Sequence, residues 1–241
     1  MTQKTFDLTP EYPGIPADAA KSGVRHLVFL GFRISWPRRI GDLGMNTQLA
    51  ETWEEAFDHW SIDGRRVHMG HSGIGYEVNL GDGLATFTLQ EPNVTLPVAR
   101  QHGDALVRML RSTERGPLTL HCEAQYLDPN VGSDYKALTA QIASRVLNSE
   151  FTAALGVELV EVQYLVDAIF EGQWFQIQAG PIRAEQIADF VDSARLRQIP
   201  RYARFYSVSS RSELGVANFD FDAFLERVFR MGETVAAEIQ K

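Results

Sequence analysis

Residues 118–128 alternate apolar and polar side chains along almost their whole length. Successive side chains of a β-strand point to opposite faces, so Leu120 and Cys122 would face a core while His121 and Glu123 would share the other face. A strand with one apolar and one polar face is typical of an antiparallel sheet, because the strands of a parallel sheet are covered on both faces. The alternation therefore predicts a half-covered antiparallel sheet at the centre of the fold.

The other segments predict further strands and the helices that flank such a sheet. Glycines between short apolar runs indicate antiparallel hairpins, and apolar residues at helical spacing indicate amphipathic helices. Hairpins joined by flanking helices are typical of the α+β class, here with a largely antiparallel sheet and a long C-terminal helix. The predicted strands lie in residues 25–36, 65–89, 118–128, 157–170, 173–179 and 201–208, and the predicted helices in residues 46–60, 96–111, 134–147, 181–196 and 222–239.

The order of these elements predicts two ferredoxin-like halves that share one sheet. Residues 1–23 contain three prolines among small polar residues and predict an extended N-terminal tail. The first α+β half would cover residues 24–150, and the second would cover residues 151–241 with the C-terminal helix. A single integrated domain is the alternative, because 241 residues fit either one large domain or two small ones.

Charge and cysteine content narrow the functional classes. The chain carries 23 Lys and Arg residues against 31 Asp and Glu residues, a net charge of −8, whereas nucleic-acid-binding proteins usually display a basic surface. Nucleic acid is therefore a disfavoured partner, and a basic protein is a favoured one.

Cys122 is the only cysteine, which excludes an intrachain disulfide and fits a reducing compartment. No apolar run approaches the ~18 residues of a membrane helix, so we expect a cytoplasmic protein.

Three stretches of the chain together resemble a known family. They are Phe32-Arg33-Ile34 ahead of a proline, Gln125-Tyr126-Leu127-Asp128 at the end of the central strand, and the acidic-aromatic residues 218–222 before the last helix. The chain resembles a sporadically distributed, uncharacterised family of bacterial α+β proteins, some of them encoded near defence or mobile-element loci. That family commonly ends the central strand with Arg-Tyr-x-Asn, whereas Gln125 and Asp128 stand here. The resemblance implies a fold of this class and no known activity.

His121, Glu123 and Arg33 are the candidate catalytic or ligand-binding residues. His121 and Glu123 share the polar face of the central strand, and Arg33 lies on the less apolar face of residues 25–36. If the two strands are neighbours, the three side chains meet on one sheet face, where acid–base groups with shifted pKa values mark functional sites. The alternative is the solvated face of an antiparallel sheet, which needs no function.

His68 and His71 are candidate ligands of a divalent metal. They lie three positions apart in a glycine-rich stretch, and a catalytic zinc site needs a third protein ligand. On a regular strand, residues three apart face opposite sides, so a shared metal would require a turn at Gly70. A glycine-kinked hairpin with two surface imidazoles is the alternative.

The chain has no P-loop or dinucleotide-binding motif, and we expect no cofactor.

The lack of a recognisable catalytic constellation favours an interaction protein over an enzyme. Trp36, Trp60, Arg204 and Tyr206 are candidate interface residues, because Trp, Tyr and Arg are enriched at binding hot spots. We therefore expect a non-enzymatic module that binds another protein within a bacterial defence or mobile-element system. Two alternatives stay open: an enzyme or small-ligand binder that uses the polar sheet face, and an acidic immunity-type inhibitor of a basic toxin. A homo-oligomer also stays open.

Overall fold

The computed structural model describes the chain in segments. The predicted N-terminal tail, residues 1–23, lies outside the described residues. The described residues are 26–37, 44, 46–47, 51, 57–64, 66–71, 76–81, 83–90, 96–111, 117–128, 134–148, 150, 153–154, 159–187, 202–214 and 219–240.

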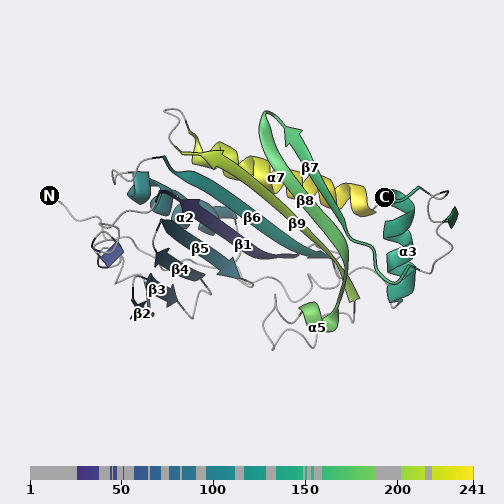
Figure 1. The fold of residues 1–241 in the computed structure, drawn as a ribbon, viewed down its shortest axis with the longest axis horizontal. Coiled ribbons are helices and arrows are strands. Elements are labelled where there is room, and N and C mark those ends of the chain that lie inside the picture. Colours follow the sequence, from purple (N-terminus) through teal and green to yellow (C-terminus); the bar gives the residue numbers. More distant parts are fainter. Residues whose placement is uncertain are drawn as a thin grey trace.

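The described strands form one antiparallel sheet that runs through both halves of the chain (Figure 1). β6 pairs with β9, and this pairing joins the strands of the first half to those of the second. Within the described part, the sheet has nine strands in the order β2-β3-β4-β5-β1-β6-β9-β8-β7. Their bounds are β1 His26–Ser35, β2 His59–Asp63, β3 Arg66–His71, β4 Tyr76–Gly81, β5 Leu84–Gln90, β6 Thr119–Asp128, β7 Tyr164–Phe170, β8 Gln173–Arg183 and β9 Tyr202–Glu213.

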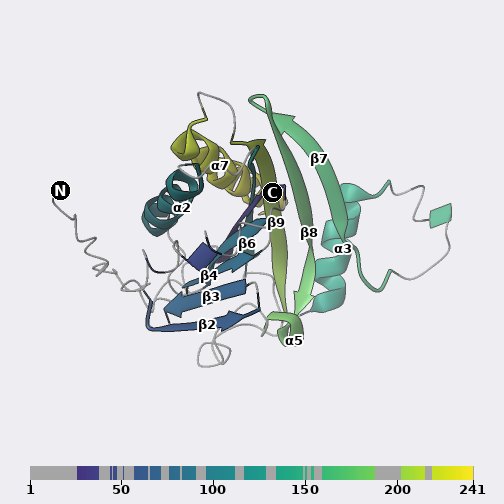
Figure 2. The same cartoon turned by 60° about the vertical axis from the view of Figure 1, so that its left-hand side comes forward.

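Two helices cover one face of this sheet. The described helices are α2 Leu96–Arg111, α3 Tyr135–Val146, α5 Ala184–Ile187 and α7 Phe221–Gln240. α7 packs against β6 and β9, while α2 packs against β1, β5 and α7, so the two helices lie side by side over the sheet (Figure 2). α3 contacts β8, and α5 contacts β8 and β9. None of the described helices is long and apolar enough to cross a membrane.

The core lies between α2, α7 and the apolar side of the strands. Phe32 of β1 and Leu120 and Cys122 of β6 are almost fully buried there. Phe224 and Leu225 of α7 pack into the same cluster. Because alternate residues of each strand point to this side, the residues between them form a second face that α2 and α7 leave open.

The predicted α+β class, antiparallel sheet and long C-terminal helix are confirmed. α2 has the predicted bounds, and α3 begins directly after Asp134, whose carboxylate accepts a hydrogen bond from the Lys136 backbone amide. This contact satisfies one of the amide groups that a helix leaves unpaired at its first turn. β7 and β8 form the predicted hairpin, which turns at Glu171 and Gly172, both with positive φ.

Two helix boundaries predicted from the sequence are wrong. His59 and Trp60 do not end a helix but begin β2, which pairs with β3. Pro181 does not begin a helix either, because β8 continues to Arg183 and the described residues of α5 are Ala184–Ile187. The remainder of the predicted helix, residues 188–196, lies outside the described residues. Pro181 lies opposite Arg204 in the register of β8 and β9. Long-range strand pairing therefore outweighs the local signal of a proline at a helix start.

Candidate functional site

A row of basic side chains crosses the open face of the central strands. The register places Arg33 of β1 directly opposite His121 of β6, and His121 directly opposite Arg211 of β9. The Cα atoms of such pairs lie about 4.5–5.5 Å apart, so the three side chains stand side by side. The structure brings Arg33 and His121 together, as neighbouring strands would require. It adds Arg211, which the sequence pattern does not pair with His121.

Glu123 lies one step along β6 on the same open face. Its Oε1 accepts hydrogen bonds from Ser207 Oγ at 2.9 Å and from Gln125 Nε2 at 2.8 Å. The Gln125 Oε1 atom is buried and accepts no hydrogen bond in the described structure. Glu123 is therefore engaged by neutral donors, and the candidate residues His121, Glu123 and Arg33 do share one face.

Burial lowers the pKa of His121 below its ordinary value. The Glu123 carboxylate opposes this effect and raises the pKa, whereas the Arg33 and Arg211 guanidinium groups lower it further. The lowered pKa favours the neutral imidazole, which has one ring nitrogen as donor and the other as acceptor. Two cations beside a neutral imidazole suit the binding of an anion, because charge-assisted hydrogen bonds are the strong ones.

The candidate metal pair is not brought together. His68 lies on the open face, where its Nδ1 is 2.8 Å from Asn79 Oδ1 and its ring centroid is 5.9 Å from that of His59. His71 lies on the opposite face of β3, with its Nδ1 3.9 Å from Asp58 Oδ2. β3 continues through both residues, so their side chains point to opposite sides. Among the described residues, no group of three or more His, Cys, Asp or Glu side chains is placed to hold a metal.

Three of the four candidate interface residues are buried. Trp36 is 6% exposed, Arg204 7% and Tyr206 1%. The Tyr206 ring stacks on Tyr126, with centroids 4.9 Å apart. Large side chains buried to this degree stabilise the fold and cannot contact a partner. Trp60, which is 57% exposed, is the one candidate of the four that stands on the surface.

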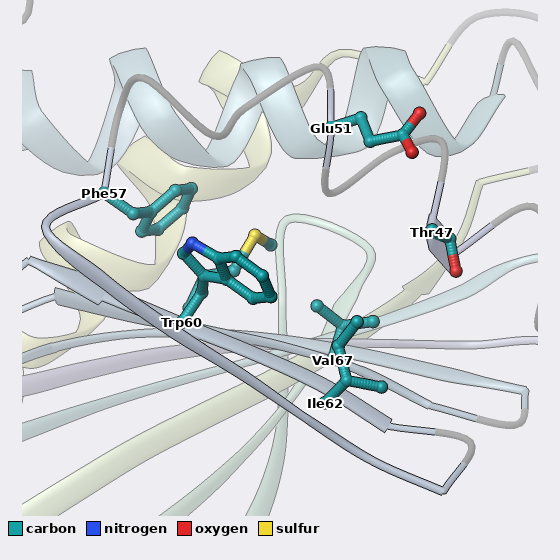
Figure 3. Close-up of a pocket in the computed structure, with 7 residues that line it drawn as sticks. Thr47, Glu51, Phe57, Trp60, Ile62 and Val67 are labelled. Atoms are coloured by element: carbon teal, nitrogen blue, oxygen red, sulfur yellow. The ribbon is translucent and has the colours of Figure 1, made fainter.

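Trp60 lines a second candidate site, at the β2 edge of the sheet. Trp60 and Ile62 of β2 are 57% and 54% exposed and share the helix-covered side with Met69 and Val67 of β3. In Figure 3, Trp60, Ile62 and Val67 rise from the strands, whereas Thr47 and Glu51 lie above them. A pocket of about 220 Å³ lies between, lined by Thr47, Glu51, Phe57, Trp60, Ile62, Val67 and Met69.

Two hydrogen bonds fix the walls of this pocket. The buried Asn46 side chain donates from Nδ2 to the Gly81 carbonyl at 3.0 Å, which ties the neighbouring Thr47 to the end of β4. The Asp58 backbone amide donates to the Gly70 carbonyl at 3.1 Å and sets the start of β2. A single helix over residues 46–60, as predicted from the spacing of apolar residues, does not contain this site. The polar-apolar alternation of residues 59–63 was the signal that points to a strand.

The opposite edge of the sheet is also apolar. β7 ends the strand order, and Leu165, Val166 and Ile169 are exposed there, Ile169 by 79%. Asp167 lies among them and accepts a hydrogen bond from Gln176 Nε2 at 3.1 Å. At the β2 edge the exposed side chains also line a pocket, and this makes the β2 edge the stronger candidate.

Two candidate sites thus emerge, a basic row on the open face and an apolar pocket at the β2 edge. The basic row joins residues from both halves of the chain through the pairing of β6 with β1 and β9. No protein-family model and no curated protein matches the chain, so the function is argued from these two sites.

Proposed function

We propose that the protein is a non-enzymatic interaction module that binds an extended, basic segment of a partner protein at the β2 edge. The observation that carries this proposal is the pocket of about 220 Å³ beside the edge, which Trp60 and Ile62 line with exposed apolar side chains. Exposed apolar side chains that gather at one place on a surface mark interaction sites, whereas isolated ones need no explanation.

The β2 edge suits the addition of a partner strand. An edge strand presents backbone N–H and C=O groups to a further strand, and β2 is the first strand of the described sheet order. Main-chain hydrogen bonds give such complexes their affinity, and pockets for alternate side chains give them specificity. A segment beside β2 would place every second side chain on the face where the pocket lies.

The size and lining of the pocket favour one long side chain. Pockets for drug-sized ligands measure about 300–1,000 Å³, and this one is smaller. Trp60, Phe57 and Met69 form apolar walls. Glu51 supplies a carboxylate (Figure 3). A lysine or arginine side chain fits both features, because its aliphatic stem packs on apolar surface while its charged head stays close to water and the carboxylate.

The charge around the pocket also favours a basic segment. Among the described residues of this edge, Glu51, Asp58 and Asp63 are acidic, while Arg66 is basic. The whole chain carries a net charge of −8. Opposite charge on a partner speeds its association and disfavours acidic competitors.

Affinity co-purification from the native host tests this proposal with three versions of the chain. Trp60→Ala removes a large exposed wall of the pocket, and Ile169→Ala removes an exposed apolar side chain at the other edge as a matched control. We expect a stoichiometric partner with the wild type and the control. The partner should be lost with Trp60→Ala and weakened by moderate salt, since exposed charges are screened.

Mapping of the contact by cross-linking completes the experiment. The cross-linked region of the partner should be basic and extended. Equal recovery of the partner with Trp60→Ala, or an acidic contact region, would refute the proposal. Recovery of a homo-oligomer that Trp60→Ala dissociates would assign the β2 edge to self-association instead.

We further propose that this activity belongs to a bacterial defence or mobile-element system, as the resemblance of the three stretches to such a family suggests. In the special case of a basic toxin as partner, the protein would act as an immunity-type inhibitor, and association would depend strongly on salt. The identity of the co-purified partner distinguishes a toxin from other basic proteins.

A further inference from the structure

We propose that Arg33, His121 and Arg211 form a binding site for a small organic phosphate on the open face of the sheet. This site lies on the opposite face from the pocket, because Trp60 shares its side of the sheet with core residues such as Met69. The inference therefore does not rest on the proposed interaction at the β2 edge.

The three side chains form one row across three adjacent strands. His121 stands between the two arginines in the register. Two steps of about 4.5–5.5 Å separate the Cα atoms of Arg33 and Arg211, a span that two long side chains close over one anion. Both arginines are exposed, and His121 is half-buried between them.

The two guanidinium groups form no ion pair within the described part of the chain. Other described arginines do form ion pairs, among them Arg100, Arg108, Arg204 and Arg230. Glu123, the carboxylate one step along β6, accepts hydrogen bonds from Ser207 and Gln125 instead. Two exposed arginines that stand together, with no ion pair among the described residues, leave room for an external anion.

The donors match a phosphate group. Each guanidinium presents a planar fork of N–H groups that fits phosphate oxygens in pairs, and two such cations balance a dianion. The neutral His121 imidazole adds one N–H donor. Trp174 lies beside this row, with the Arg211 Cζ atom 5.6 Å from its ring centroid. A flat ring attached to the phosphate would therefore meet the Arg211 guanidinium and the Trp174 ring beside it, and a guanidinium plane stacks on flat rings.

Titration of the isotope-labelled full chain, followed by NMR, tests the proposal at constant ionic strength. The probes are inorganic phosphate, adenosine 5′-monophosphate and adenosine. We expect the two phosphates to shift the amide signals around residues 33, 121 and 211 with a Kd of about 1 mM or tighter. Adenosine monophosphate should bind more tightly than inorganic phosphate, and adenosine alone should leave these signals in place.

Variants at the two arginines decide whether the row forms the site. Arg33→Gln and Arg211→Gln should each weaken phosphate binding at least about tenfold, because each removes charge-assisted hydrogen bonds. Lysine at either position keeps the charge and loses the fork, so its effect should be smaller than that of glutamine. If a glutamine variant fails to fold, the lysine variant at that position takes its place.

Arg111→Gln is the matched control, because Arg111 is an exposed arginine of α2, on the covered side of the sheet. It should leave phosphate binding unchanged, as should Trp60→Ala. The proposal is overturned if phosphate produces no saturable shift, if sodium chloride produces the same shift, or if Arg111→Gln weakens binding equally. Tighter binding of a short single-stranded oligonucleotide than of adenosine monophosphate would overturn the small-molecule assignment.

Discussion

Arg204 and Asp128 form an ion pair on the covered side of the sheet, with 3.4 Å between Nη1 and Oδ2. Both side chains are buried, and Arg204 Nη2 also donates to Gln141 Oε1 on α3 at 2.7 Å. The guanidinium therefore joins β9 to β6 and to α3. A buried charge of this kind depends on its partner, because an isolated charge is expensive to remove from water.

We expect Asp128→Asn to lower the free energy of unfolding by about 3–5 kcal/mol, since it leaves the buried guanidinium without a counter-charge. Urea unfolding of the two proteins measures the difference. Glu171→Gln is the control, because it breaks the exposed pair between Glu171 and Arg230, and such pairs contribute about 0–1 kcal/mol. A loss at Asp128 no larger than that of the control would contradict the prediction.

The pKa of His121 should lie below about 6.5, the ordinary value of a histidine, because burial disfavours the charged imidazole. The Glu123 carboxylate raises the pKa of His121, so Glu123→Gln should lower that pKa further. The Arg33 guanidinium lowers the pKa of His121, so Arg33→Gln should raise it. Proton NMR titration of the imidazole measures these values, with His121→Gln to assign the signal. A pKa above the ordinary value in the wild type would contradict the burial of this ring.

Stability should depend on pH through the same group. The unfolded chain binds a proton at His121 at higher pH than the folded protein does, so the free energy of unfolding rises with pH between the folded and unfolded pKa values. The neutral imidazole of His121 adds its full contribution to the free energy of unfolding above about pH 6.5. This contribution is lost as the pH falls through the pKa of His121 in the folded protein. Urea unfolding of wild type and His121→Gln from pH 7 to 5 should show a steeper loss for the wild type. Parallel curves would contradict this dependence.

Cys122 should resist thiol reagents in the folded protein. The side chain is fully buried, and burial raises the pKa of its thiol, so the reactive thiolate is scarce. We expect reaction with an aromatic disulfide reagent only when denaturant unfolds the chain. Absorbance of the released thiol measures the rate in native buffer and in urea, and rapid reaction in native buffer would place Cys122 near the surface.

The alternation of residues 118–128 was sufficient to predict the faces of the central strand. Cys122 and Leu120 are buried, and His121 and Glu123 are half-buried on the open face. Local periodicity succeeds here because each strand has one covered and one open side. The same periodicity could not show that the face of Arg204 and Tyr206 is covered, since alternation separates the two faces without showing which one a helix will occupy.

The two candidate sites depend on information that single segments do not contain. Arg211 stands beside His121 because β9 pairs with β6, a contact between residues about ninety positions apart. No local pattern of charge or hydropathy specifies that register. At the β2 edge, Trp60 continues a helical spacing from the preceding residues and also alternates with His59 and Ser61. Pairing of β2 with β3 decides between these two periods.

Gly232 of α7 should not tolerate alanine, although alanine normally favours a helix by about 1 kcal/mol over glycine. A Cβ atom at this position would overlap the Tyr126 hydroxyl and lie 2.6 Å from its Cζ atom. The Tyr126 ring is held by stacking on Tyr206, with 7° between the ring planes, so it has little freedom to move away. Overpacking of this kind costs about 1–3 kcal/mol, which outweighs the gain in helix propensity.

Urea unfolding of Gly232→Ala should therefore show a net loss of stability. Gln101→Ala, at an exposed position of α2, should stay within about 0.5 kcal/mol of the wild type. A more stable Gly232→Ala protein would mean that the Tyr126 ring shifts freely, and the close approach of α7 to β6 would then not require a glycine.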